Sequence, residues 1–309
     1  MARVTVFGEP LLELASTASG GVLGAARLGV AGDTLNTAVY LARLGHSVNY
    51  VTALGHDTYS AAIIERLDGE GVHTHHIVRH PSRVPGLYAI RTDTAGERFF
   101  TYWRDQSAAR EFFTLGDATT AIGVAYASDL FYFSGISMAI LSPEQRAQLF
   151  EVARSCRARG VDVAFDGNYR PYGWQSADQA RDCLTRVGEV ASIVLPTSED
   201  DDQLFGHTTP LTHAQRWRTF GAELVAVKHG PNGAYVVADA IEPTHVPVDQ
   251  VIQPLDTTGA GDSFNAAFLA GVLNGRSVTE AAAMGNRLAA RVIQHRGALI
   301  PTGEMPSTR

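Results

Sequence analysis

Two kinds of hydrophobic pattern alternate along the chain. Short apolar runs typical of strands cover residues 4–7, 11–14, 48–53, 161–165, 193–195, 224–227 and 234–237. Between them, apolar residues recur at helical spacing over 33–44, 57–67, 143–159 and 278–294, and Asp33 and Gly45 are the expected cap and stop of the first helix. Strands separated by helices favour a mostly parallel sheet covered by helices on both faces. The pattern therefore predicts an α/β fold, in which ligands gather at the carboxyl ends of the strands.

Residues 86–104 depart from this rhythm. They have strand character on both sides of 94–96, and a three-residue loop there would place Tyr88 opposite Tyr102. Alternation then puts Arg104 on the same face as both tyrosines. This face is either ordinary cross-strand packing with a solvated charge or the underside of a lid over a polar ligand. An isolated hairpin is only marginally stable, so it must pack on another part of the chain, and residues 11–14 are expected to add a strand to the same small sheet.

The composition of the chain limits the classes of protein to which it can belong. The chain has 309 residues, of which 45% are hydrophobic and 18% charged, so it suits one large globular domain over 1–309 with a small appendage. The net charge of −7 leaves no basic surface for nucleic acid or acidic lipid. No apolar run is long enough to span a bilayer, and the first residues lack the features of a signal peptide. We therefore expect a cytoplasmic protein that binds neither nucleic acid nor membrane.

Cysteine and histidine give weak signals. Cys156 and Cys183 fall in helical segments without metal-ligand spacing and are interpreted as reduced packing residues. In the segment 71–80, His73 and His75 would share a strand face, so a zinc site is one interpretation. No cysteine or acidic side chain accompanies them, which favours a solvated strand edge.

The segment 256–264, Asp-Thr-Thr-Gly-Ala-Gly-Asp-Ser-Phe, gives the strongest chemical signal. Gly259, Ala260 and Gly261 leave the backbone bare, so consecutive N–H groups can aim at one point where a helix begins. Such groups, with the positive end of the helix dipole, make an anion site. Asp262 in the first turn can then accept a proton from an attacking hydroxyl, although the simpler interpretation of such an Asp is a helix cap. The helix that follows is expected to end at Asn274-Gly275 and to show one apolar face, formed by Phe264, Ala267, Phe268, Gly271 and Val272.

This segment resembles the C-terminal signature of the ribokinase-like (PfkB) carbohydrate kinases. It is neither a Walker A loop nor a dinucleotide fingerprint. A second segment, 32–38, resembles the sugar-binding Gly-Gly-Asp-x-x-Asn element of the same family, with Ala31 in place of the first glycine. The resemblance runs over nearly the whole chain. It implies a three-layer α/β sandwich with a mostly parallel central sheet and a small β lid from about 9–17 and 84–106.

The resemblance also implies roles for single residues. Asp262 would be the catalytic base, and the N–H groups of Gly259, Ala260 and Gly261 would hold the migrating phosphoryl group. On the sugar side, Gly32, Asp33 and Asn36 would meet vicinal hydroxyls, for which a carboxylate and an amide offer suitable acceptors and donors.

Four further segments are similar to the bacterial 2-keto-3-deoxygluconate kinases of this family: 85–88, 96–104, 133–137 and 165–171. The residues implied to line a sugar-acid pocket are Tyr88, Tyr102, Arg104 and Arg170. A sugar acid carries a carboxylate that must be paired when it leaves water, and guanidinium groups match it. The alternative for either arginine is a surface ion pair.

The nucleotide side is implied by the resemblance alone. ATP would lie near Asn168, Thr197, Lys228, Gly230, Gly233, Thr257 and Asn286. Residues 197–200 replace the family's Asn-x-x-Glu motif, with Thr197 for the Asn and Asp200 for the Glu. Asp200 or a neighbouring acid would then position Mg²⁺, held mainly through phosphates and water. A monovalent cation, K⁺, is expected near Asp256.

These inferences converge on one expected activity, the ATP-dependent phosphorylation of the 6-hydroxyl of 2-keto-3-deoxygluconate. The lid would close over the sugar acid, and its apolar faces would pair subunits into a homo-oligomer. The resemblance also implies a place in sugar-acid breakdown of the Entner–Doudoroff type. The alternatives are another sugar kinase (a ribokinase, a fructokinase or a related deoxy-sugar-acid kinase) and a non-catalytic sugar-binding regulator, which would have no need of a base at Asp262.

Overall fold

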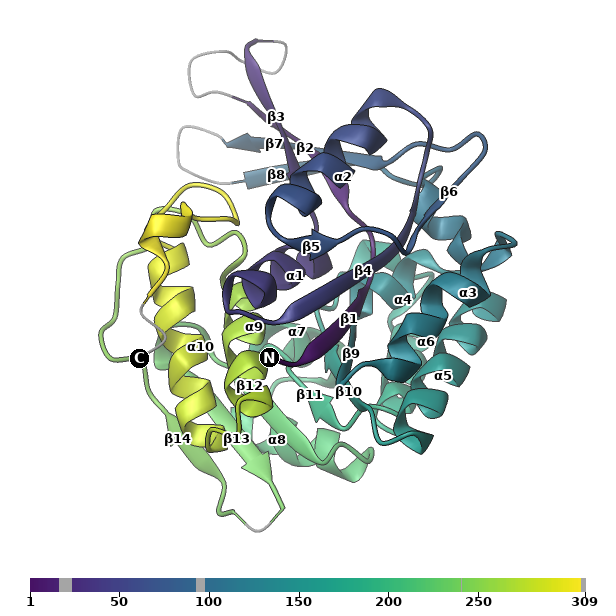
Figure 1. Ribbon diagram of the computed structural model, residues 1–309. Helices are drawn as coiled ribbons and strands as arrows, with labels where there is room; N and C mark the ends of the chain where they lie inside the picture. The colour runs from purple at the N-terminus through teal and green to yellow at the C-terminus, as the bar shows by residue number, and fades with distance from the viewer. Residues whose placement is uncertain (17–23, 93–97, 240, 307–309) are drawn as a thin grey trace.

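Two sheets organise the molecule. A computed structural model describes residues 1–16, 24–92, 98–239 and 241–306. The larger sheet has the strand order β14-β13-β12-β11-β10-β9-β1-β4-β5, and β6 also pairs with β4 (Figure 1). Pairing is parallel throughout except at β13 and β14, which run antiparallel to their neighbours. Its strands are β1 (Arg3–Phe7), β4 (Ser47–Leu54), β5 (Val72–His73), β6 (Ile77–Arg79), β9 (Leu130–Ser134), β10 (Asp162–Asp166), β11 (Ile193–Val194), β12 (Leu224–Lys228), β13 (Ala234–Ala238) and β14 (Thr244–Val246).

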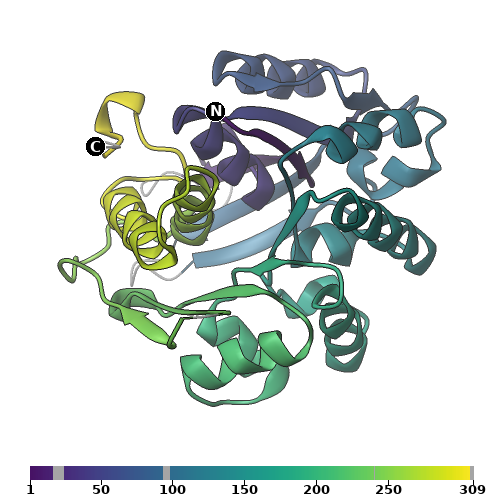
Figure 2. The ribbon, with the colours of Figure 1, turned by 60° about the horizontal axis from the view of Figure 1, so that its bottom comes forward.

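Strand residues alternate between two hydrophobic cores, one on each face of the large sheet. Along β9, Phe131 and Phe133 join one core and Leu130 and Tyr132 the other. The first core packs against α3 (Ala118–Ile122), α4 (Gly135–Ile140), α5 (Pro143–Ala158), α6 (Ala177–Val187), α7 (Ser198–Phe205) and α8 (Pro210–Thr219). The second packs against α1 (Asp33–Arg43), α2 (Thr58–Gly69), α9 (Ala260–Leu273) and α10 (Val278–Val292) (Figure 2). The predicted three-layer α/β sandwich is confirmed. Within the described part of the chain, every helix is too short or too polar to cross a membrane.

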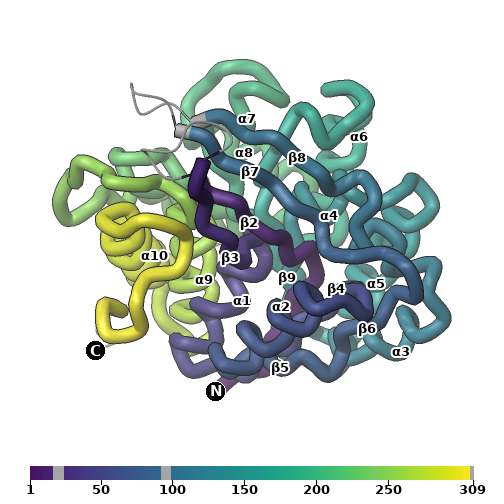
Figure 3. The backbone as a smooth tube through the Cα atoms, turned by 90° about the horizontal axis from the view of Figure 1, so that it is seen from above, coloured from purple at the N-terminus to yellow at the C-terminus, as the bar shows by residue number. Residues whose placement is uncertain are grey.

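The smaller sheet lies over the carboxyl end of the larger one, where the chain leaves β1 (Figures 1 and 3). Its order is β3-β2-β7-β8, from β2 (Leu11–Ser16), β3 (Ala26–Ala31), β7 (Gly86–Thr92) and β8 (Arg98–Trp103). Tyr88 pairs with Tyr102, as the loop position predicts, although the loop residues 94–96 lie outside the described residues. The strand β3 was not predicted, because Gly29 and its exposed neighbours give no strand pattern.

Two local expectations were wrong. Asp33 does not cap α1: the N-cap is Gly32, at φ 137°, and Asp33 is the first helical residue. A Cβ on Gly32 would lie 2.6 Å from the carbonyl oxygen of Glu9, so this turn requires glycine. The helix α9 ends at Asn274 as expected, but it is buried on every side from Ser263 to Gly271, because α1 and α10 both pack against it.

The cysteines and the histidine-rich segment occupy different settings. Cys156 and Cys183 are both buried and free. The strand β5 ends at His73, so His75 is not part of it and the two side chains do not share a strand face. Over the described ranges no group of three or more His, Cys, Asp or Glu is arranged to hold a metal ion.

Candidate active site

One pocket of about 1140 Å³ collects the residues singled out in the sequence. It lies between the carboxyl end of the large sheet, the small sheet and the helices α9 and α10. All the predicted catalytic, sugar, nucleotide and metal positions line it: Gly32, Asp33, Asn36, Tyr88, Tyr102, Arg104, Asn168, Arg170, Thr197, Asp200, Lys228, Gly230, Gly233, Thr257, Gly259, Ala260, Gly261, Asp262 and Asn286. Segments far apart in the chain are thus brought to the place where ligands of such sheets bind.

The N-terminus of α9 faces this pocket without a side-chain cap. Its N-cap, Gly259, has φ 76°, and a Cβ there would lie 2.7 Å from the Cβ of Ala298. The loop before it is fixed by Asp256, whose Oδ1 accepts from the backbone N of Thr258 at 2.8 Å and whose Oδ2 accepts from the N of Gly297 at 2.9 Å. A helix start held open in this way suits an anion.

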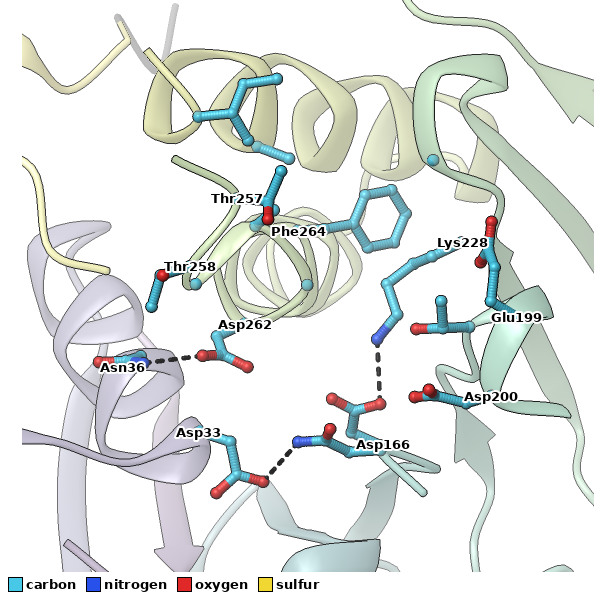
Figure 4. A pocket seen from close by; sticks show the side chains of 18 of the residues that line it. Asp33, Asn36, Asp166, Glu199, Asp200, Lys228, Thr257, Thr258, Asp262 and Phe264 are labelled. Carbon is cyan, nitrogen blue, oxygen red and sulfur yellow. Dashed lines mark hydrogen bonds and ion pairs between the residues drawn. The ribbon is translucent and has the colours of Figure 1, made fainter. Parts of the chain in front are cut away.

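Asp262 stands in the first turn of α9, beside this open end (Figure 4). The Asn36 Nδ2 donates to its Oδ2 at 2.8 Å. Burial and the nearby charge of Asp33 raise the pKa of Asp262 to about 8, while the hydrogen bond from Asn36 opposes the rise. A carboxyl group with a pKa close to neutral is suited to accept a proton.

Asp33 faces Asp262 across the floor of the pocket. It accepts from the Asn168 Nδ2 at 2.9 Å, and burial raises its pKa. Asn168 itself has φ 31°, a left-handed conformation that asparagine tolerates better than most residues. The Asn36 Oδ1 is buried and has no hydrogen-bond partner among the described residues. Because a buried acceptor is costly without a donor, this end of the pocket is prepared for a hydroxyl group.

A third carboxylate, Asp166, ends β10 on the other side of the floor. Its Oδ1 accepts from the Lys228 Nζ at 3.0 Å and its Oδ2 from the Asn265 Nδ2 at 2.8 Å. The sequence placed Asp166 only within a matched segment, and nothing in the pattern drew attention to Asn265, which lies inside a buried helix. Its contact with Asp166 spans 99 positions in the chain.

Arg170 and Asp200 form an ion pair at the pocket wall. One guanidinium nitrogen, Nη1, donates to both carboxylate oxygens, at 2.9 and 3.0 Å. Burial raises the pKa of Asp200, and the charge of Arg170 opposes this. The Arg170 side chain remains 42% exposed, so the pair can exchange partners with a ligand. Asp200 lies in the first turn of α7, after Thr197 as N-cap.

The other predicted arginine is held more tightly. Arg104 donates from Nε to Glu9 Oε2 at 3.0 Å and also from Nη2, and both side chains are buried. This pair joins the chain after β1 to the chain after β8, and so it anchors the small sheet to the large one. Glu9 was missed in the sequence, since an acid after a strand has no distinguishing pattern. Beside the pair, Tyr102 stacks on Tyr172 with ring centroids 4.6 Å apart.

At the end of the pocket beside α10 and β14, one amide side chain lies among apolar residues. The Asn286 amide donates to the carbonyl oxygens of Val246 and Pro247, at 2.9 and 3.2 Å. Its polar group therefore fixes the end of β14. The remaining lining on this side includes the apolar residues Val248, Val251, Ile252, Ala289, Ala290 and Ile293. Such a surface suits a flat apolar ring.

Comparison with known proteins agrees with this arrangement. The family model described as "pfkB family carbohydrate kinase" matches residues 1–304. The chain is 39% identical to the 2-dehydro-3-deoxygluconokinase of Escherichia coli K12 over 99% of both chains. The crystal structure of a PfkB protein from a Polaromonas species has a TM-score of 0.84 at 29% identity and covers 95% of this chain and 96% of its own. A putative ribokinase II from E. coli, solved in complex with ATP and Mg²⁺, shares the fold, with a TM-score of 0.83 at 22% identity over 99% of this chain and 96% of its own.

These matches cover nearly the whole chain, and the shared signature falls on the open helix terminus and its neighbouring carboxylate. The chain therefore belongs to the PfkB family of carbohydrate kinases.

Proposed function

We propose that this protein transfers the terminal phosphoryl group of ATP to the 6-hydroxyl of 2-dehydro-3-deoxygluconate, which is also named 2-keto-3-deoxygluconate. The observation that carries the proposal is the position of Asp262. Its carboxyl group lies next to the uncapped start of α9 and in the same pocket as a guanidinium that a ligand can reach. The full-length similarity to 2-dehydro-3-deoxygluconokinases supports the choice of substrate.

The chemistry follows from that position. Asp262 accepts the proton of the 6-hydroxyl while the oxygen attacks the terminal phosphorus. A bond forms between that oxygen and phosphorus, and the bond from phosphorus to the bridging oxygen of ATP breaks, so that ADP leaves with the bonding electrons. The N–H groups at Gly259, Ala260 and Gly261 stabilise the charge on the transferring group. Asp33 and Asn36 orient the sugar through its other hydroxyls.

The substrate's carboxylate is assigned to Arg170. Its present partner, Asp200, can be replaced by a ligand carboxylate of the same charge and shape. Arg104 offers less, because Glu9 already compensates its charge in a buried pair. Tyr88 and Tyr102 would complete the wall against which the sugar acid lies.

Asp200, with its neighbour Glu199, also fits a role toward magnesium. Each Asp200 oxygen accepts one hydrogen bond from Arg170 and has a further lone pair, with which it can order a metal-bound water. When bound with ATP, magnesium would neutralise part of the phosphate charge. A monovalent cation near Asp256 belongs to the same proposal.

A coupled assay of ADP formation tests the proposed activity. The purified protein is given ATP and a panel of sugar acids and neutral sugars, including the gluconate and galactonate epimers of the substrate. We expect turnover with 2-dehydro-3-deoxygluconate and little with ribose or fructose. Preference for a neutral sugar would replace the proposed substrate, and ligand binding without turnover would indicate a regulator.

The small sheet is proposed to pair subunits. The sheet face opposite Tyr88 and Tyr102 leaves Leu28 and Trp103 exposed, at 45% and 60%. Exposed apolar groups on one sheet face are typical of a protein interface. Light scattering should show an oligomer, and Trp103→Ser should reduce its size; a monomeric wild-type protein would contradict the proposal.

A further inference from the structure

Lys228 is the only lysine in the chain. Of the 25 lysine and arginine residues, the other 24 are arginines. A sequence that uses guanidinium for every other cationic side chain thus keeps a single ammonium group, and it keeps it inside the pocket. Arginine and lysine differ in shape and in the directions of their donors, so this choice points to a requirement of the site.

The surroundings of the ammonium group are closely built. Lys228 ends β12 and is 7% exposed. Its Nζ donates to Asp166 Oδ1 at 3.0 Å and to Asn265 Oδ1 at 2.9 Å. Asn265 in turn donates to Asp166 Oδ2 at 2.8 Å and to the Tyr132 hydroxyl at 3.2 Å. Lysine, aspartate and asparagine therefore form a closed ring in which each fixes the other two.

One donor of the ammonium group remains for the pocket. A lysine has three N–H groups, and two are directed at Asp166 and Asn265. In the part of the chain that the structure describes, Nζ makes no third hydrogen bond. A Cβ built on Gly261 would lie 3.7 Å from Nζ, so the ammonium group sits against the first turn of α9 (Figure 4). It shares the space in front of that helix start with Asp262.

We infer that Lys228 is a catalytic residue whose ammonium group binds the transferring phosphoryl group, and that Asp166 and Asn265 are its positioning residues. This inference rests on the proposed phosphoryl transfer. The ammonium donates its third N–H to a phosphoryl oxygen, opposite the N–H groups of α9. Its three donors diverge around one nitrogen and can rotate, so they meet two side chains and a ligand on different sides, whereas the donors of an arginine are fixed in one plane.

Charge supports the same role. Without the lysine, the floor of the pocket would present Asp33, Asp166 and Asp262 to a polyanion. Lys228 compensates one of these charges at the point nearest the anion site.

A single lysine makes a direct test possible. Protein grown with ¹⁵N-labelled lysine has one side-chain ammonium signal, which needs no assignment. We expect this signal to shift when a non-hydrolysable ATP analogue with Mg²⁺ and the sugar acid is added, and to shift much less with ADP, which lacks the terminal phosphate. As an internal control, Arg154→Lys on the exposed face of α5 adds a second signal that should not respond. An unchanged Lys228 signal, with analogue binding shown by a raised melting temperature, would overturn the inference.

Variants provide an independent readout. Lys228→Met alone would leave Asp166 buried without its cation, so the double variant Lys228→Met/Asp166→Asn removes both charges together. We expect it to remain folded and to lose about 100-fold or more in kcat, the loss typical of one preorganised donor, with a much smaller change in KM for the sugar acid. Lys228→Arg should also lose most activity.

These results separate the two proposals. A folded double variant with near-normal kcat would refute the role of Lys228 and leave the kinase activity standing. A wild-type protein that phosphorylates no sugar acid would refute the proposed function, and the lysine signal would still report whether the terminal phosphate reaches Nζ.

Discussion

The pocket has two halves, whose carboxylates are paired with different kinds of group. In one half, Asp33 and Asp262 are held by the neutral amides of Asn168 and Asn36. In the other half, Asp166 and Asp200 are each paired with a cation, Lys228 and Arg170, and Asp166 also accepts from the Asn265 amide. All four carboxyl groups line the same cavity (Figure 4).

This difference divides the chemistry of the site. An amide satisfies a carboxylate without cancelling its charge, so burial can raise the pKa and prepare the group to take up a proton. A cation cancels the charge, and a polyanion can then approach. The amide half is thus suited to the sugar hydroxyls, and the cation half to phosphates and the substrate's carboxylate.

The largest expected effect comes from Asp262→Asn, which gives the amide half's base a neutral side chain of the same size. We expect kcat to fall by about 100-fold or more, as is usual for a lost general base. Steady-state assays with ATP and the sugar acid would measure this. Near-normal turnover would show that the amide half does not supply the base.

The same variant should be more stable than the wild type. The pKa of Asp262 lies at about 8 in the folded protein, above its ordinary 3.8, so its contribution to stability is present below pH 3.8 and lost as the pH rises through about 8. An asparagine does not ionise, so Asp262→Asn removes this pH-dependent loss of stability. Its gain in the free energy of unfolding over the wild type should therefore grow between pH 3.8 and about 8. Asp201 is the matched control: burial raises its pKa to about 7, and Trp217 donates to it at 2.7 Å outside the pocket. Asp201→Asn should gain stability in the same direction with kcat unchanged, as urea unfolding at several pH values and assays would show.

The second-largest effect is expected at the buried ion pair between Arg104 and Glu9. Arg104→Ala leaves Glu9 buried without its partner, and we expect the free energy of unfolding to fall by about 3 kcal/mol. Adding Glu9→Gln should restore much of it, because the unpaired charge is removed. If Arg104→Ala instead left stability unchanged, the pair would not anchor the small sheet.

A smaller effect is expected at the partly exposed ion pair between Arg170 and Asp200. Arg170→Ala should raise KM for the sugar acid by about 10-fold or more, the value of a hydrogen bond to a charged group, with little change in stability. Neutral sugar alcohols tested as inhibitors provide the comparison, since their binding should not change. An unaltered KM would show that Arg170 does not bind the carboxylate of the substrate.

The smallest effect is a shift in pH dependence. The rate constant kcat/KM should rise with pH as free Asp262 loses its proton near pH 8. Asn36→Ala removes a donor that favours the charged form, so the rising limb should move to higher pH. If kcat/KM of both proteins instead rose in the pH range in which carboxyl groups ordinarily titrate, the raised pKa of Asp262 would be contradicted.

The parts of the fold that could be predicted are those with local causes. Period-two and helical spacing located β1, β4, β10 and α5, and the hairpin loop set the register of Tyr88 and Tyr102. The start of α9 could be predicted because bare backbone and an acid in the first turn act locally. The character of α9 could not, since its burial on all sides depends on α1 and α10.

The partners of the charged groups could not be predicted either. Arg104 and Arg170 were expected to meet a substrate carboxylate, with a surface ion pair as the alternative, but their protein partners were not foreseen: Glu9 at a separation of 95 positions and Asp200 at 30. Which carboxylate reaches which cation depends on where strands end in space, and a single sequence carries no mark of it.

The hydrogen bond from Asn36 to Asp262 has a consequence for refolding. It joins residues 226 positions apart, and the bond from the Tyr40 hydroxyl to the Ala298 carbonyl, behind the same loop, spans 258. Closing such long loops costs conformational entropy before the stabilising contacts form. Hydrogen bonds between residues so far apart in the chain therefore form late in folding. A chain recovering from denaturant should regain its helical circular dichroism first and its ability to turn over ATP last.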